Sequence, residues 1–197
     1  MATVTQPTKP EPVEVIQRWR FSVKDYHRMG EAGIFPPEAR VELIEGEIIA
    51  MSPIGFRHRS RVARLDALMN GTLGARANVF IQSSIQLDDY SEPEPDVVVA
   101  RPRPDFYLDL PVTPPDVLLL IEVMETSADY DRRVKLALYA RAGVAEVWLV
   151  DLKKDRVETY RRPVGGSYQD MMSLGRGQSL APEALADLIL TVDSILG

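Results

Sequence analysis

Two apolar runs near the middle of the chain each carry one carboxylate. Residues 94–99 read Glu-Pro-Asp-Val-Val-Val, and residues 117–123 read Val-Leu-Leu-Leu-Ile-Glu-Val. Unbroken β-branched and leucine residues over about four to eight positions predict strands that are covered on both faces of a sheet. A carboxylate in such a strand is costly unless a cation or hydrogen bonds receive it. If the two strands are neighbours, Asp96 and Glu122 are expected to share one cation.

The rest of the pattern alternates between helix and strand signals. Ser22 is a plausible N-cap for a short helix that the following glycines and prolines end. Glu45-Gly46 is a turn signal between two strand-like runs, which predicts a β-hairpin. The predicted elements are a helix over 23–29, hairpin strands over 41–44 and 47–51, an amphipathic helix over 56–73, a half-buried strand over 79–87, a helix over 129–142 that ends at Gly143, a strand over 144–150 and a further strand over 157–161.

The order strand, helix, strand over 117–150 predicts a right-handed crossover with two parallel strands. The expected fold class is therefore α/β, with three layers around a central mixed β-sheet and an added N-terminal helix and hairpin. Residues 165–177 are expected to form a loop, and 182–196 is ambiguous between helix and coil. Residues 1–14 are rich in proline and are expected to be a disordered tail, which leaves 15–197 as one domain.

Composition narrows the chemistry. The chain has no cysteine, so a metal would be held by oxygen ligands or histidine, which favours magnesium, manganese or calcium. The net charge of −6 argues against a surface that binds nucleic acid everywhere and requires a local basic patch instead. No signal peptide or membrane-spanning run is evident, so a cytoplasmic protein that does not enter a membrane is expected.

One basic patch is evident in the amphipathic helix over 56–73. Arg57, Arg61 and Arg64 fall at helical spacing on one side, and His58 lies beside them. Such a ridge could contact successive phosphates of a nucleic acid, with a strong salt dependence. A solvated helix face that pairs with nearby acids is an equally good interpretation.

Several motifs in order resemble a known family. Pro95-Asp96 followed by Ile121-Glu122-Val123 resembles the signature of the PD-(D/E)XK nuclease superfamily. The segments 42–47, 94–96, 122–139 and 142–151 together resemble the Uma-two family of restriction-endonuclease-like proteins, over roughly residues 20 to 165. The resemblance implies a restriction-endonuclease-like fold and a Mg²⁺-dependent endonuclease, with Mn²⁺ as an alternative ion, that hydrolyses phosphodiester bonds in DNA. A homodimer is expected because cutting two strands commonly needs two sites.

The resemblance also assigns roles to residues. Asp96 and Glu122 would hold the metal with the backbone carbonyl of Val123. The usual motif has a lysine two residues after the glutamate, but this chain has Met124 there. Lys135 on the following helix is expected to replace it. Glu42 is expected to add a second metal ligand or to orient water.

Other interpretations remain open from the sequence. Glu122 could point to water at the end of its strand, and Asp131 and Lys135 could form a solvated ion pair on a helix. Glu42 could instead pair with Arg40. Met124 at the lysine position also allows a second function, a catalytically degenerate nuclease-fold module that binds nucleic acid or a protein partner without turnover.

Overall fold

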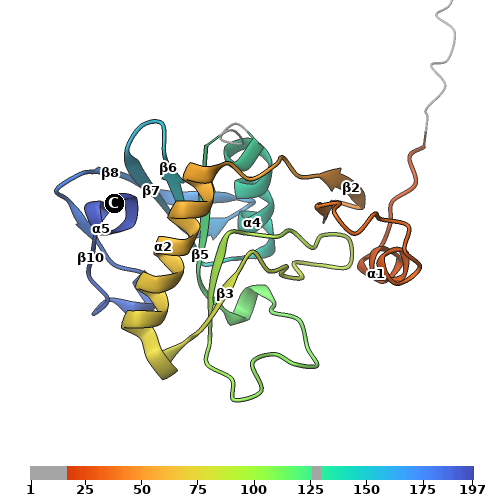
Figure 1. Cartoon of the computed structure of the whole chain (residues 1–197), viewed down its shortest axis with the longest axis horizontal. Helices are drawn as coiled ribbons and strands as arrows, with labels where there is room; N and C mark the ends of the chain where they lie inside the picture. Colours follow the sequence, from red (N-terminus) through yellow and green to blue (C-terminus); the bar gives the residue numbers. More distant parts are fainter. Residues whose placement is uncertain (1–16, 126–129) are drawn as a thin grey trace, which may run out of the picture.

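A six-stranded mixed sheet forms the centre of the computed structural model, which describes residues 17–125 and 130–197 (Figure 1). The tail expected over residues 1–14 lies outside the described residues, and so does residue 129, where a helix was expected to begin. Strands follow one another across the sheet in sequence order. They are β3 (Asn78–Ile81), β4 (Val97–Ala100), β5 (Val117–Met124), β6 (Glu146–Asp151), β7 (Arg156–Val164) and β8 (Ser167–Gly175).

The predicted parallel pairing of the two strands is confirmed. β5 and β6 are parallel, with Ile121 beside Trp148 and Glu122 beside Leu149, whereas the other neighbouring strands of this sheet are antiparallel. The connecting chain includes the π-helical turn η3 (Asp131–Lys135) and the helix α4 (Leu136–Ala142). Gly143 ends α4 in the left-handed conformation, as a glycine after a helix readily does.

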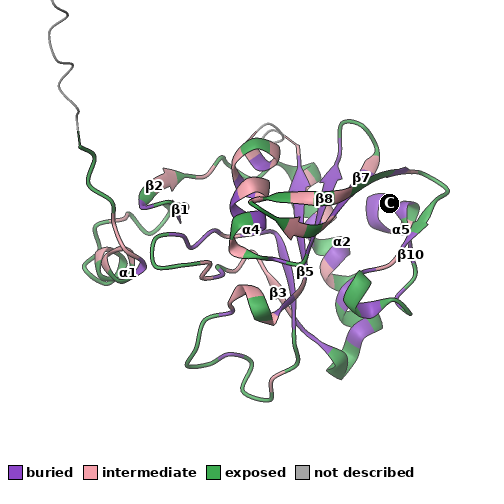
Figure 2. Cartoon of the chain, turned by 180° about the vertical axis from the view of Figure 1, so that it is seen from behind, coloured by how far each residue is buried: buried purple, intermediate pink, exposed green. Residues whose placement is uncertain are grey.

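Helices cover both faces of the sheet (Figures 1 and 2). On one face, α2 (Phe56–Leu73) and α5 (Val192–Leu196) pack their apolar residues against alternate residues of β4, β5 and β6. On the other face, α4 packs against the intervening residues of the same strands. β4 and β5 are therefore buried from both sides, which explains their continuous apolar sequences.

The N-terminal unit carries Glu42 toward the sheet. Ser22 caps α1 (Val23–Glu31), and the hairpin strands are β1 (Val41–Ile44) and β2 (Glu47–Ala50). Glu45 and Gly46 both have positive φ, as a tight hairpin turn requires. Leu43 exchanges two backbone hydrogen bonds with Glu92, so the hairpin is fastened to the segment that leads into β4.

Two predicted elements are wrong in extent or type. The strand expected over 79–87 ends at Ile81, because Gln82 takes a positive φ and turns the chain out of the ladder. The loop expected over 165–177 is largely the edge strand β8, whose mostly exposed residues need no apolar alternation.

The ambiguous segment at 182–196 contains only short elements. The short elements of the chain are η1 (Gly74–Arg76), η2 (Pro114–Asp116), β9 (Ser179–Leu180), η4 (Glu183–Leu185), β10 (Leu190–Thr191) and α5. Among the described residues, no helix has the length and apolarity to cross a membrane.

Candidate functional site

Asp96 and Glu122 lie side by side where β4 and β5 pair. The register pairs Val97 of β4 with Ile121 of β5; Asp96 directly precedes Val97, and Glu122 directly follows Ile121. The Val123 amide donates to Asp96 Oδ2 at 2.8 Å, and the Asp96 amide reaches Glu122 Oε2 at 3.4 Å. The two residues are only 8% and 4% exposed. The interpretation in which Glu122 points to water is therefore wrong.

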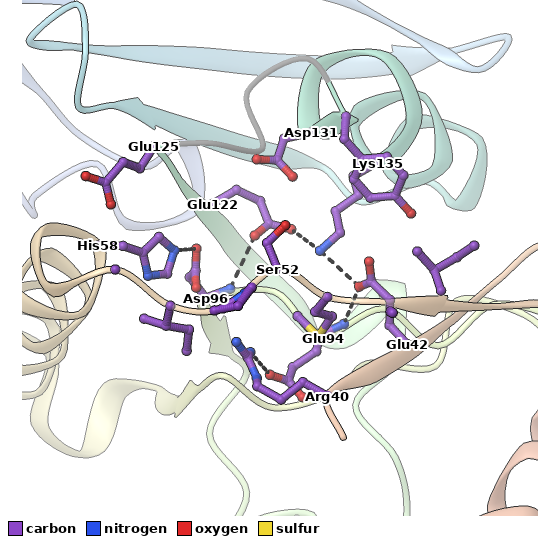
Figure 3. A pocket seen from close by; sticks show the side chains of 17 residues that line it. Arg40, Glu42, Ser52, His58, Glu94, Asp96, Glu122, Glu125, Asp131 and Lys135 are labelled. Atoms are coloured by element: carbon purple, nitrogen blue, oxygen red, sulfur yellow. Dashed lines mark hydrogen bonds and ion pairs between the residues drawn. The ribbon is translucent and has the colours of Figure 1, made fainter. Parts of the chain in front are cut away.

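Lys135 reaches the same carboxylate from η3. Its Nζ lies 3.0 Å from Glu42 Oε2 and 3.3 Å from Glu122 Oε1 (Figure 3). Lys135 is only 4% exposed, and Asp131 is buried as well, so the solvated ion pair of the sequence interpretation is wrong. Burial alone would lower the pKa of Lys135, but the charges of Glu122 and Glu42 outweigh burial and hold that pKa well above its usual range. The two carboxylates therefore favour the protonated ammonium form of Lys135.

Glu122 is the most perturbed acid of the group. Burial raises the pKa of Glu122 to about 8, although the ammonium of Lys135 acts in the opposite direction. The Tyr139 hydroxyl also donates to Glu122 Oε1 at 2.6 Å. The carboxylate is thus held by two donors but remains short of positive charge. A further cation next to Glu122 would stabilise its ionised form.

Met124 lies on the same face of β5 as Glu122 but is enclosed. Its side chain is fully buried in the apolar cluster under α4, where Tyr139 and Leu149 also pack. The lysine of the usual motif would bury its ammonium in this cluster, where few polar partners are available. The chain instead supplies its ammonium from Lys135 on the segment that covers this face.

Arg132 fastens η3 to the sheet. Its guanidinium donates to Asp151 Oδ2 at 2.6 Å and to both oxygens of Glu158 at 3.0 and 3.1 Å. These contacts tie the turn to the end of β6 and to β7, while Asp131 and Lys135 on the same turn are buried toward the interior. A π-helical turn is uncommon and is often found at functional sites.

A cavity of about 570 Å³ opens above these side chains. Five site residues predicted from the sequence line this cavity: Glu42, Asp96, Glu122, Lys135 and His58. Several further polar residues that were not predicted as site residues also line it, and their one signal in the sequence was proximity to the hairpin and to the two acidic strands. The additional polar lining residues are Arg40, Ser52, Glu94, Glu125, Tyr130 and Asp131.

The basic residues predicted to act together on α2 have different surroundings in the structure. His58 lines the cavity, and its Nε2 lies 3.0 Å from Asp96 Oδ2. Burial would lower the pKa of His58, but the hydrogen bond with Asp96 leaves that pKa above its ordinary value. Arg57, Arg61 and Arg64 do not line the cavity. Arg57 instead reaches the Leu152 carbonyl, and the guanidinium groups of Arg61 and Arg64 lie against Gly197.

Side chains of the described residues supply only part of the ligand shell that a hard cation such as Mg²⁺ needs. Within residues 17–125 and 130–197, no group of three histidine, aspartate or glutamate side chains is arranged to hold a metal ion. Asp96 and Glu122 offer two carboxylates beside the backbone of Val123. Mg²⁺ commonly binds proteins through one or two carboxylates and completes its shell with water and substrate oxygens. The residues therefore fit a magnesium site of this kind.

Comparisons with known proteins identify a family and a similar fold. The model of the Uma2 family, described as "Putative restriction endonuclease", matches residues 23–193. A similar solved structure is described as a "putative nuclease belonging to DUF820" from Anabaena variabilis. It is 18% identical, with a TM-score of 0.65, and the match covers 85% of this chain and 96% of that chain. This likeness shows the fold. No curated protein matches the chain.

Restoring the usual lysine at position 124 is expected to destabilise the protein. Met124→Lys places an ammonium in the apolar cluster under α4, and we expect a loss of roughly 3–5 kcal/mol in the free energy of unfolding. Met124→Leu keeps the volume and is expected to cost less than about 1.5 kcal/mol. Urea unfolding followed by circular dichroism measures both. Equal stability of the two variants would contradict the enclosed position of Met124.

The Arg132 contacts are expected to make stability depend on acidity. Burial would raise the pKa values of Glu158 and Asp151, but hydrogen bonds from Arg132 outweigh it and leave both below their ordinary values of 4.5 and 3.8. These acids therefore stabilise the fold above their ordinary pKa values, and this contribution disappears as pH falls through the lowered values. We expect Arg132→Gln to cost about 1–3 kcal/mol near neutral pH.

Melting temperatures at about pH 7 and pH 3.5 test this expectation. The wild-type protein should lose more of its melting temperature on acidification than Arg132→Gln does, because the variant has already lost the contacts that depress the two pKa values. Arg76→Gln, which breaks an exposed ion pair with Asp187, provides the control and should follow the wild type. An equal loss in wild type and Arg132→Gln would contradict the stated role of the contacts.

Proposed function

The chain belongs to the Uma2 family of restriction-endonuclease-like proteins, and from this premise we propose that it is a Mg²⁺-dependent endonuclease that hydrolyses phosphodiester bonds in DNA. The observation that carries the proposal is the meeting of Asp96, Glu122 and Lys135 in one cavity. Two carboxylates on adjacent strands and one ammonium are the groups that metal-assisted hydrolysis of a phosphate ester requires.

Asp96 and Glu122 would hold the ion, together with the carbonyl of Val123. Mg²⁺ bound there would lower the pKa of a water nucleophile and neutralise charge on the phosphate. Mn²⁺ prefers similar oxygen ligands and is expected to replace Mg²⁺. Tyr139 and Lys135 fix the orientation of the Glu122 carboxylate, and the Val123 amide fixes that of Asp96. Both acids are thus oriented before an ion arrives.

Lys135 acts as a cation and not as a base. Its raised pKa keeps the ammonium protonated, so it can stabilise negative charge on a phosphate oxygen but cannot accept a proton from water. Glu42 holds the other side of this ammonium and therefore acts as a positioning residue for Lys135.

His58 is the candidate proton acceptor. Its Nε2 faces the Asp96 carboxylate, and its buried Nδ1 has no hydrogen-bond partner among the described residues. In the tautomer in which Nε2 donates to Asp96, Nδ1 carries a lone pair, and accepting a proton there requires a water molecule to enter beside the enclosed ring. This places the base and the ammonium on opposite sides of the acid pair in Figure 3.

Isosteric replacement of the acids is expected to abolish hydrolysis. Asp96→Asn and Glu122→Gln remove metal-binding charge without removing volume, and each should lower the cleavage rate of DNA by about 100-fold or more. Lys135→Met should lower the rate while Mg²⁺ still binds. Calorimetric Mg²⁺ titration and cleavage of plasmid and linear DNA measure the two effects, with Asp187→Asn as a surface control.

The outcomes separate the two functions that the sequence left open. Loss of both cleavage and metal binding in Asp96→Asn is the expected result. If the wild-type protein binds nucleic acid but cleaves neither DNA nor RNA with Mg²⁺ or Mn²⁺, the endonuclease proposal is wrong and the binding module without turnover is favoured.

A further inference from the structure

A cation and an apolar side chain lie side by side at the mouth of the cavity. Arg40 directly precedes β1 and Met51 directly follows β2, and the Met51 amide donates to the Arg40 carbonyl at 2.9 Å. This hydrogen bond closes the open end of the hairpin. Both residues line the cavity, and the side chains of Ile49 and Ile54 continue the apolar side.

Arg40 is the accessible cation of this cavity. Its side chain is 32% exposed, and one nitrogen donates to Glu94 Oε1 at 2.6 Å. The Glu94 amide in turn donates to Glu42 Oε2 at 3.2 Å, which links the pair to the buried group. A guanidinium has five N–H donors in a planar fork that matches phosphate oxygens. The described contacts of Arg40 leave donors that can reach a phosphate while Glu94 holds the group in place.

The charge of the lining makes Arg40 important for an anionic substrate. Among the described residues, six carboxylates line the cavity, and the other cationic side chain, Lys135, is already held between two of them at the bottom. A phosphate that approaches this acidic opening is repelled unless a cation meets it. Among the lining residues, Arg40 is the one placed to do so near the surface.

The apolar side of the mouth suits a flat, weakly polar group. Ile54 is 37% exposed and, with Ile49 of β2 and Met51, forms an aliphatic wall along the end of β2 and its connection to α2. A volume of about 570 Å³ lies in the range of pockets that enclose one small organic group. A nucleobase has apolar faces and hangs from a phosphate, so one nucleotide offers both features that the mouth presents.

We propose that this mouth binds one unpaired nucleotide, with Arg40 on its phosphate and the wall of Ile49, Met51 and Ile54 against its base, and that the protein therefore prefers single-stranded nucleic acid. This inference rests on the proposed function and adds its substrate class. In a duplex the base is stacked and paired, and it can reach the wall only after leaving the stack. An unpaired strand does not have this cost.

The preference also bears on the expected homodimer. Cutting both strands of a duplex commonly needs two catalytic sites, whereas cutting a single strand needs one. Cleavage of a single strand therefore does not require a dimer. The wall is aliphatic and carries no base-reading polar group among its three side chains. Binding there tolerates every base.

Fluorescence anisotropy with a labelled single-stranded oligodeoxynucleotide tests the proposal. The measurement uses the full chain and Ca²⁺, which is intended to support binding without turnover. The strand is compared with the same strand annealed to its complement, and we expect the single strand to bind at least about 10-fold more tightly. Arg40→Gln should weaken the binding by about 10-fold and reduce the slope of log affinity against log salt by about 0.7, the contribution of one phosphate contact.

Ile54→Gln tests the base contact, and two matched variants serve as controls: Ile34→Gln for Ile54→Gln, and Arg76→Gln for Arg40→Gln. Ile54→Gln should weaken binding of the natural strand severalfold but leave binding of a strand with abasic sites unchanged. Ile34→Gln alters an exposed isoleucine outside the cavity and should change neither. Arg76→Gln removes the same charge as Arg40→Gln from an exposed ion pair and should preserve the salt slope. Melting temperatures of all variants establish that each protein is folded.

The outcomes distinguish this inference from the proposed function. Equal or tighter duplex binding, or an unchanged salt slope in Arg40→Gln, overturns the inference even when the wild type cleaves DNA with Mg²⁺. Single-strand binding that depends on Arg40 and Ile54 but is accompanied by no cleavage supports the nucleotide site and removes the endonuclease proposal. A wild-type protein that neither binds nor cleaves any strand overturns both.

Discussion

Four charged side chains are buried together, and the site depends on how their charges are matched. Glu42, Asp96, Glu122 and Lys135 come from four separate parts of the chain and are each nearly inaccessible to water. One ammonium stands among three acids, so the group carries excess negative charge even when every hydrogen bond is made. Burial is the main cause of the raised pKa of Glu122, and the negative charges of Asp96 and Asp131 raise it further, so an additional cation in the cavity would stabilise the ionised carboxylate.

Much of this arrangement could be predicted because the sequence marks it locally. A carboxylate within an unbroken apolar strand is a strong signal, since water cannot reach it and some partner must. The parallel pairing of β5 and β6 follows from the length of the connection between them and from the handedness of such crossovers. The hairpin was visible in Glu45-Gly46, whose two positive φ angles suit a tight turn. The position of Lys135 was predicted through family resemblance, and the structure places its ammonium at the expected carboxylate.

The parts that were not predictable depend on contacts between distant residues. The π-helical form of η3 has no evident pattern in sequence, and the contacts of Arg132 with Asp151 and Glu158 hold that turn on the sheet. β8 was missed because an exposed edge strand has no apolar face to reveal it. Helical spacing grouped three arginines of α2 on one side but could not show that Gly197 lies beside two of them and that the third reaches the Leu152 carbonyl. The sequence suggested Arg40 only as a partner of Glu42, but Arg40 pairs with Glu94 and Glu42 pairs with Lys135, and sequence spacing does not reveal these contacts.

The backbone hydrogen bonds between Leu43 and Glu92 join the hairpin to a distant part of the chain, so the site is complete only after the hairpin has docked. Three of the six strands of the central sheet, β3, β4 and β5, lie between Glu42 and Lys135 in sequence, so bringing these two residues together requires closing a long loop, with its entropic cost. The order of folding then favours the local strand pairs first and the hairpin's docking late. A nascent or partly folded chain would hold Asp96 and Glu122 without the hairpin's contribution, and the group of four charged side chains would be complete only in the finished fold.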